Sequence, residues 1–117
     1  MWGAEDIWLQ RLQQHASPVW KPAVFTGNAT ELMDNWESAS AGFVKYLQGV
    51  REESELSKPL TIINLKGESH EDAISAILTH VFNHATYHRG QLVTMLRQSG
   101  VTEIPQTDFI VFARMKM

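Results

Sequence analysis

Three histidines stand four residues apart in this 117-residue chain: His80, His84 and His88. In an α-helix, a spacing of four residues corresponds to roughly 6 Å along the axis and 40° around it. Two imidazoles at this spacing can bind one divalent metal ion at about 2.0–2.1 Å each. The outer two histidines would stand about 12 Å apart along the axis, so at most two of the three can share one ion.

The expected metal-binding pair is His84 and His88, because both continue the apolar stripe of Ile77 and Val81 and should face the interior. His80 is rotated about 40° further, so we expect it at the surface or beside the ligands. The alternative is that the histidines are hydrogen-bonded core residues, since zinc usually takes three or four protein ligands. Ala85 follows His84 where a His-Glu-x-x-His motif would have glutamate, which excludes metalloprotease chemistry.

The composition is that of a soluble globular protein, with 44% apolar residues, 20% charged residues and a formal net charge of −3. We therefore expect a single domain over residues 1–117. The chain has no cysteine, which excludes disulfides, thiolate metal sites and a cysteine nucleophile. Lysine and arginine are scattered, so nucleic acid is not an expected partner. The longest apolar run, residues 109–113, is too short to cross a membrane, and the acidic N-terminus is unlike a signal peptide, so we expect a cytoplasmic protein.

Apolar periodicity predicts three long helices, over residues 2–15, 28–53 and 70–99. The first helix places Ala4, Trp8 and Leu12 on its apolar face and has no capping residue before it. Its polar residues are expected to lie off that face: Glu5, Asp6, Gln10 and Arg11.

The second helix should begin at Asn28, which forms a capping-box-like pair with Glu31. Its apolar seam has bundle spacing and comprises Leu32, Trp36, Ala39, Phe43, Leu47 and Val50. Small residues at 38–42 would permit the close approach of a neighbouring helix. Residues 57–67 break the helical period, and residues 60–65 have strand composition, which predicts an extended segment or small hairpin.

The third helix is expected to begin at Ser69, paired with Asp72, and to end at Gly100. Its stripe comprises Ile74, Ile77, Val81, His84, His88, Leu92 and Met95, with Leu78 and Leu96 beside it. In the tail, Thr107 or Asp108 could cap a short closing helix, although the apolar residues that follow are also compatible with a strand. The fold class is therefore all-α, a bundle of three long helices with a short extended segment and a short C-terminal element. The uncapped start suggests that a fourth helix preceded the first.

Four segments of the chain together resemble the DinB family. Residues 78–92, with the sequence LTHVFNHATYHRGQL, resemble the signature of its last long helix. Residues 2–12 resemble its second helix, residues 62–68 its short extended segment, and residues 105–112 its closing Pro…Thr-Asp segment. The resemblance covers nearly the whole chain.

The resemblance implies a four-helix bundle, arranged up-down-down-up, with nickel or zinc at a three-histidine site. His84 and His88 match two of the ligands, whereas the first helix and the third ligand would lie before Trp2. His15 cannot substitute for that ligand, because it lies about 20 Å further along a straight helix. Three arrangements remain open: a homodimer partner supplies a ligand, the amine of Met1 takes its place, or the domain is N-terminally shortened and binds metal weakly. We prefer the last, combined with homodimerisation that covers the exposed apolar stripe.

Three further residues are candidates for the pocket or for orienting the ligands. Asp108 could accept a hydrogen bond from a ligand histidine, but we prefer an N-cap or an ion pair with Arg89. Tyr87 could reach the pocket with its hydroxyl, although packing is its more usual role.

Two functional hypotheses follow. The first is a DinB-type enzyme, a metal-dependent thiol transferase or hydrolase acting on a small substrate, with His84 and His88 as ligands, nickel or zinc as the only cofactor and no assigned catalytic residue. The second is a non-catalytic helical bundle whose role is association and which has lost metal binding.

Overall fold

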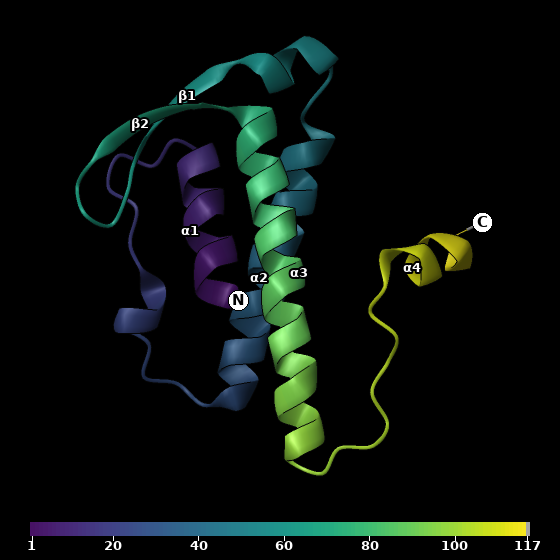
Figure 1. Cartoon of the computed structure of the whole chain (residues 1–117). Helices are drawn as coiled ribbons and strands as arrows, with labels where there is room; N and C mark the ends of the chain where they lie inside the picture. The colour runs from purple at the N-terminus through teal and green to yellow at the C-terminus, as the bar shows by residue number, and fades with distance from the viewer. Residues whose placement is uncertain (117) are drawn as a thin grey trace.

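The computed structural model describes residues 1–116 and is mainly helical, which confirms the predicted all-α class (Figure 1). Its helices are α1 (Trp2–Leu12), α2 (Ala29–Gln48), α3 (Ile74–Gln98) and α4 (Phe109–Met115), with short 3-10 turns at Lys21–Ala23 and Glu53–Ser57. Strands β1 (Pro59–Ile63) and β2 (Ser69–Ala73) form one antiparallel hairpin. Within residues 1–116, no helix is both long and apolar enough to cross a membrane.

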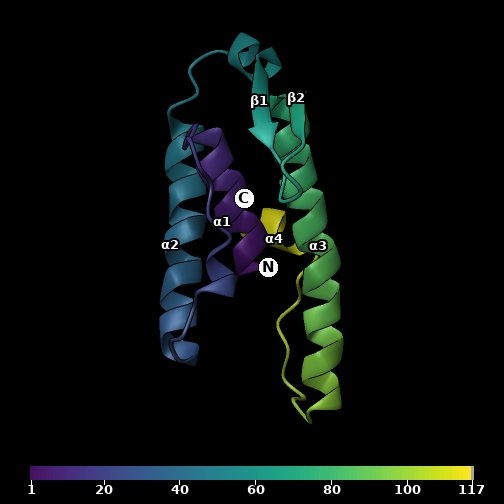
Figure 2. The ribbon, with the colours of Figure 1, turned by 90° about the vertical axis from the view of Figure 1, so that its left-hand side faces the viewer.

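Helix α1 lies between α2 and α3 and packs against both (Figure 2). The core is formed where these three helices meet the hairpin, and its buried residues are Leu9, Leu12, Phe43, Leu60, Ile62, Ile77, Leu78 and Val81. The predicted close approach over the small residues is confirmed at Gly42, where an added Cβ atom would lie 2.5 Å from Leu9 Cδ2. The absence of a side chain at Gly42 therefore lets α1 approach α2.

The predicted start of α2 is confirmed, since Asn28 Oδ1 accepts a hydrogen bond from the Glu31 backbone N–H at 2.9 Å. The predicted end at residue 53 is wrong. Gly49 closes the helix, with its N–H bonded to the carbonyl oxygens of Lys45 and Tyr46. Val50 therefore follows the helix instead of completing its seam, and the 3-10 turn of Glu53–Ser57 forms separately.

The extended segment is confirmed, but the predicted start of the third helix at Ser69 is wrong because residues 69–73 form β2. Leu60 and Ile62 of β1 are buried, and this burial holds the hairpin against the core. Asn64 Oδ1 closes the turn by accepting the N–H groups of Lys66 at 3.0 Å and Glu68 at 2.9 Å. The sequence pattern assigned residues 69–73 to the first turn of the helix. Their backbone instead pairs across the hairpin with that of β1.

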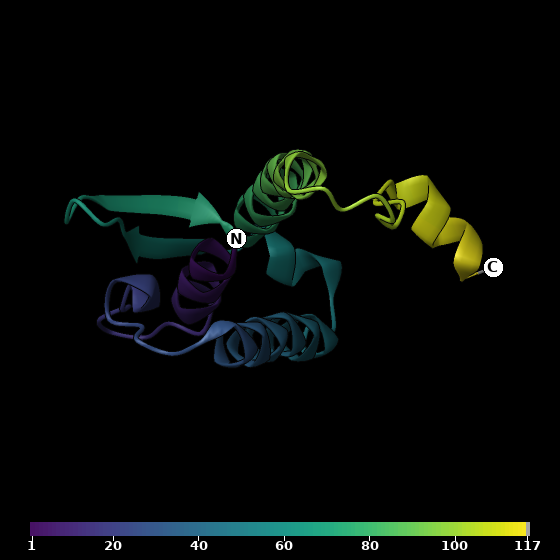
Figure 3. The ribbon, with the colours of Figure 1, turned by 90° about the horizontal axis from the view of Figure 1, so that it is seen from below.

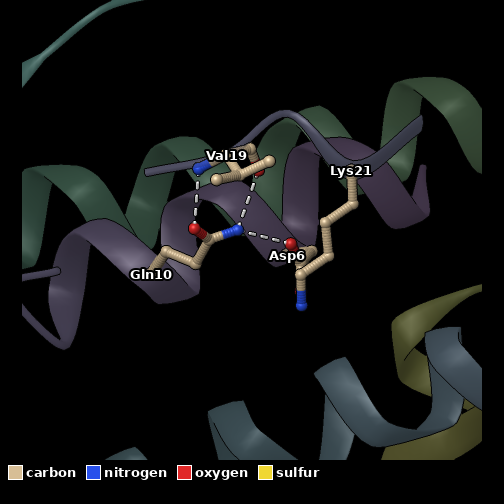
Figure 4. Close-up of polar contacts among 4 residues, drawn as sticks. All are labelled: Asp6, Gln10, Val19 and Lys21. Carbon is tan, nitrogen blue, oxygen red and sulfur yellow. Dashed lines mark hydrogen bonds and ion pairs between the residues drawn. The ribbon is translucent and has the colours of Figure 1, made fainter. Parts of the chain in front are cut away.

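Three of the four polar residues that the sequence placed off the apolar face of α1 are nevertheless buried: Asp6, Gln10 and Arg11. Gln10 Nε2 donates to Asp6 Oδ2 at 2.7 Å and to the Val19 carbonyl at 2.9 Å, while Val19 N–H donates to Gln10 Oε1 at 2.8 Å (Figure 4). Lys21 Nζ pairs with Asp6 Oδ1 at 3.0 Å. The connector after α1 therefore folds back along this face. Helix α1 ends at Leu12, three residues earlier than predicted, and its start has no side-chain cap, as expected.

Helix α3 ends as predicted, with Gly100 at a φ of +92° and Val101 N–H bonded to the Leu96 carbonyl. The predicted stripe is buried only in the first half of α3, at Ile77, Leu78 and Val81, whereas Leu92 and Met95 are exposed. The short closing helix is confirmed as α4, which follows Asp108, but the Asp108 side chain does not cap it. Figure 3 shows α4 standing apart from the other helices.

Candidate metal site

His84 and His88 lie on consecutive turns of α3, half-buried, with their ring centroids 4.4 Å apart and their planes at 85°. The His84 Nε2 and His88 Nε2 atoms are 2.9 Å apart, a hydrogen-bonding distance. In such a bond one nitrogen carries the hydrogen and the other accepts with its lone pair. The two Nε2 atoms are therefore directed toward one point, as the helical spacing predicted.

The separation of these nitrogens fits one ion held by both rings. With metal–nitrogen distances of about 2.0–2.1 Å, two ligands at a right angle stand about 2.9 Å apart, and two at a tetrahedral angle stand about 3.3 Å apart. The observed 2.9 Å matches the first value and is a few tenths of an ångström short of the second. The pair can therefore hold an ion with little movement of α3.

Gln91 orients His88, a role that the sequence reasoning missed. His88 Nδ1 lies 2.8 Å from Gln91 Oε1, and an amide oxygen only accepts, so Nδ1 carries the hydrogen. His88 Nε2 then keeps its lone pair for a ligand, the arrangement usual for metal-binding histidines. Gln91 Nε2 donates to the Tyr87 hydroxyl at 3.2 Å. The sequence could have indicated this role, because Gln91 follows His88 by three residues and therefore lies on the same face of the helix.

The histidine pair lines a groove of about 530 Å³ between α1, α2 and α3. Most of its wall is apolar, and its lining includes Met1, Trp8, Phe43, Val44, Phe82 and Leu92. Its acidic group is Glu5, whose carboxylate accepts hydrogen bonds from Trp36 Nε1 at 3.0 Å and Ser40 Oγ at 2.6 Å. The sequence reasoning had assigned no function to Glu5, since its bonds depend on how α1 packs on α2.

Of the other predicted site residues, one lines the groove and two are exposed. Arg89 lines the groove beside the histidines. His80 is exposed and stacks on His84, with 5.4 Å between ring centroids, and its other side faces Trp8 edge-on at 5.2 Å. Tyr87 is exposed, and its hydroxyl bonds to Gln91 outside the groove.

Asp108 stands at the N-cap position of α4, as predicted, but among residues 1–116 it forms neither the predicted ion pair with Arg89 nor a hydrogen bond with a histidine. The side chain makes no capping bond. In the part of the chain that the structure describes, Lys21–Asp6 is the single ion pair. The reason is the position of α4, which begins directly after Asp108 and stands apart from α3 (Figure 1).

The pKa of His84 is lowered below its ordinary value of 6.5, first by burial and then by the positive charges of His88, His80 and the N-terminal amine. A lowered pKa keeps the ring neutral near pH 7, and only the neutral ring binds metal.

Two side-chain nitrogen donors converge here, and Met1, whose amine the sequence left open as a third ligand, lines the same groove. Among residues 1–116, no group of three or more histidine, aspartate or glutamate side chains is arranged to hold a metal ion. Glu5 shares the groove, but its carboxylate is hydrogen-bonded to Trp36 and Ser40 of α2. The residues present thus supply part of a coordination sphere and leave its other positions open to the groove.

Helices of this order, with a histidine pair on the last long helix and a hairpin before it, define a DinB-type helical protein. The chain belongs to the DinB family, whose sequence model matches residues 1–116.

A stretch of 65 residues is 40% identical to Protein DinB of Bacillus subtilis (strain 168). The match covers 56% of this chain and 37% of that relative, so the matched stretch spans well under half of the relative's length. No solved structure matches the chain.

Proposed function

We propose that this DinB-family protein binds one divalent metal ion, nickel or zinc, through Nε2 of His84 and Nε2 of His88. The observation that carries the proposal is the 2.9 Å separation of these nitrogens at the wall of an open groove. The hydrogen held at His88 Nδ1 by Gln91 supports it, because it leaves the lone pair of His88 Nε2 for the ion. The lowered pKa of His84 supports it as well, because a neutral His84 ring can carry its single hydrogen at Nδ1 and bind the ion through Nε2.

We further propose that the protein is a metal-dependent enzyme, a transferase of small thiols or a hydrolase. The ion would supply Lewis acidity to a thiol or water in the groove. His84 and His88 would hold it, Gln91 would fix the ring of His88, and the apolar wall would exclude bulk water. A volume of about 530 Å³ is within the range of small-molecule sites.

Metal binding is tested by calorimetric titration of the protein with nickel or zinc. We expect one ion per chain, with binding lost in His84→Ala and in His88→Ala. His15→Ala is the matched control, since His15 is exposed and does not line the groove. Equal metal binding by all three variants would contradict the proposal.

The two reaction classes are separated with cobalt-loaded protein. A thiol transferase should give a thiolate-to-cobalt charge-transfer absorption when a small thiol is added, and His88→Ala should abolish it. A hydrolase should give no such band, and metal-dependent cleavage of an ester substrate would support that class instead.

The second candidate function is non-catalytic association. It is favoured by two observations on residues 1–116: the lack of a third donor side chain beside the histidines, and the exposed apolar surface of α4. A protein that self-associates but binds no nickel or zinc would support this candidate over the enzyme.

A further inference from the structure

Arg11 is a buried cation without a countercharge. Only 8% of its surface is exposed, and burial lowers the pKa of its guanidinium below the ordinary value of 12.5. In the part of the chain that the structure describes, Arg11 forms no ion pair, and its buried Nε has no hydrogen-bond partner. A buried charge is costly unless an opposite charge pairs with it. The guanidinium is therefore available to an anion that residues 1–116 do not supply.

Trp8 contacts Arg11 but does not satisfy its hydrogen-bond donors. The guanidinium carbon lies 4.5 Å from the centroid of the Trp8 ring, which makes a cation–π contact. This contact stabilises the positive charge, but the ring has no oxygen to accept from the five N–H groups of a guanidinium. Carboxylate and phosphate groups carry the paired oxygens that match these donors. The chemistry of Arg11 thus favours an oxyanion.

Arg11 lines a pocket of about 420 Å³ between the end of α1, the connector after it and β1. The residues that form this Arg11 pocket lie between positions 11 and 18 and between positions 59 and 63. None of them lines the histidine groove. The volume is within the range of small-molecule sites. The Arg11 pocket is therefore a second candidate site, separate from the histidines.

The free edge of β1 adds backbone donors to the Arg11 pocket. Asn64 N–H donates to the Glu68 carbonyl at 2.9 Å, so the even-numbered position 64 is directed toward the partner strand. Hydrogen bonding alternates along an antiparallel pair, so the N–H groups of Thr61 and Ile63 are directed to the opposite edge of β1. Figure 2 shows β1 on the side of α1 and β2 on the side of α3. Both residues line the Arg11 pocket, so their N–H groups are available to the same anion.

Gln14 also lines the Arg11 pocket, in a conformation that glutamine rarely adopts. Its φ is +60°, and its N–H bonds to the Arg11 carbonyl while His15 N–H bonds to the Gln10 carbonyl. These two bonds form a Schellman turn at the end of α1, where glycine or asparagine is the usual residue. A side chain at such a φ costs free energy. The glutamine gains no stability for the turn, but it places an amide donor at the pocket.

We propose that the Arg11 pocket binds the carboxylate or phosphate group of a small molecule. The guanidinium of Arg11 would pair with the oxyanion, and the N–H groups of Thr61 and Ile63 and the amide of Gln14 would donate to its oxygens. The bound anion would offset the cost of burying the guanidinium. Because the pocket shares no lining residue with the histidine groove, metal binding and anion binding can each fail without the other.

NMR titration of metal-free protein tests the proposal, with inorganic phosphate in one arm and acetate in the other. Each anion replaces chloride, so that the ionic strength stays constant. We expect saturable shifts of the Thr61 and Ile63 amide signals and of the Arg11 Nε–H signal. The anion that binds more tightly identifies the ligand group as a phosphate or a carboxylate. Shifts of these signals that do not saturate with either anion would overturn the proposal.

The charge of Arg11 is tested by Arg11→Met, which keeps an unbranched apolar side chain against Trp8. Loss of a charge-assisted hydrogen-bonding partner should raise the dissociation constant of the tighter-binding anion at least about 10-fold. Arg97→Met is the matched control, because Arg97 is exposed on α3 and lines neither site. Equal dissociation constants for Arg11→Met and Arg97→Met would contradict the proposal.

Gln14→Gly separates anion binding from a structural role. Glycine adopts a positive φ without strain, so the melting temperature should not fall, whereas the anion should bind more weakly because a donor is lost. Gln14 is exposed, so this variant should fold even if Arg11→Met does not. A stable Gln14→Gly variant that binds phosphate and acetate as tightly as the wild-type chain would show that the glutamine amide does not contact the anion and would contradict the site as proposed.

Discussion

The histidine pair is the part of the site that the sequence predicted best, because its geometry depends on one helix. Residues four apart on α3 must lie on neighbouring turns, and the apolar stripe located the side that faces the groove. The position of Asp108 could not be predicted in the same way. It lies 20 residues after His88, beyond the end of α3, so its placement depends on the path of an extended segment.

The role of Gln91 can be tested by Gln91→Ala. The substitution removes the acceptor 2.8 Å from His88 Nδ1, so the His88 ring should lose its fixed orientation. Removing an orienting partner of this kind usually weakens metal affinity about 10–100-fold. Calorimetric titration with nickel measures the change, and Gln98→Ala at the exposed end of α3 is the control. An unchanged affinity in Gln91→Ala would exclude this role.

The protonation of His84 gives a second prediction. Since its pKa in the folded protein lies below the ordinary value of 6.5, the unfolded chain binds the proton first as the pH falls. Stability should therefore decline as the pH falls below about 6.5, and acid should favour unfolding. In His88→Ala the pKa of His84 should rise toward 6.5, because a neighbouring positive charge is removed while burial remains. NMR titration of the ring protons measures both values, and a pKa of His84 above 6.5 would refute the assignment.

At the scale of elements, the sequence predicted correctly those helix boundaries that a single capping or terminating residue determines. Asn28 caps α2 and Gly100 ends α3, as their residue types predicted. Ser69 and Asp72 also formed a plausible helix start, but pairing of β2 with β1 prevailed. The sequence pattern of residues 69–73 could not reveal this outcome, because it depends on the burial of Leu60 and Ile62 in the core.

The burial of the polar side of α1 has the same tertiary origin and leads to a third prediction. Gln10→Ala would leave the N–H and carbonyl of Val19 and one bond of Asp6 without their partner. We expect a loss of about 1–3 kcal/mol in the free energy of unfolding, the usual cost of unsatisfied buried polar groups. Urea unfolding measures the loss. The control Gln48→Ala, at an exposed position near the end of α2, should change stability by less than about 0.5 kcal/mol. Equal effects of the two substitutions would contradict a clamping role for Gln10.

At the scale of the whole molecule, the groove beside the histidines and helix α4 both expose apolar side chains. The sequence stripe of α3 continued through Leu92 and Met95 as if a neighbouring helix covered them, yet both are exposed within residues 1–116. The sequence therefore predicted an apolar surface that needs a partner. What fills it depends on assembly, which a pattern of residues does not specify.

The central claim is that His84 and His88 together hold one metal ion, and a crystal of the protein soaked in nickel tests it most directly. The anomalous signal should place one ion about 2.1 Å from both His84 Nε2 and His88 Nε2. Their direct hydrogen bond, now 2.9 Å long, should then be replaced by the ion. An ion bound elsewhere on the chain, with the two rings still hydrogen-bonded to each other, would contradict the claim.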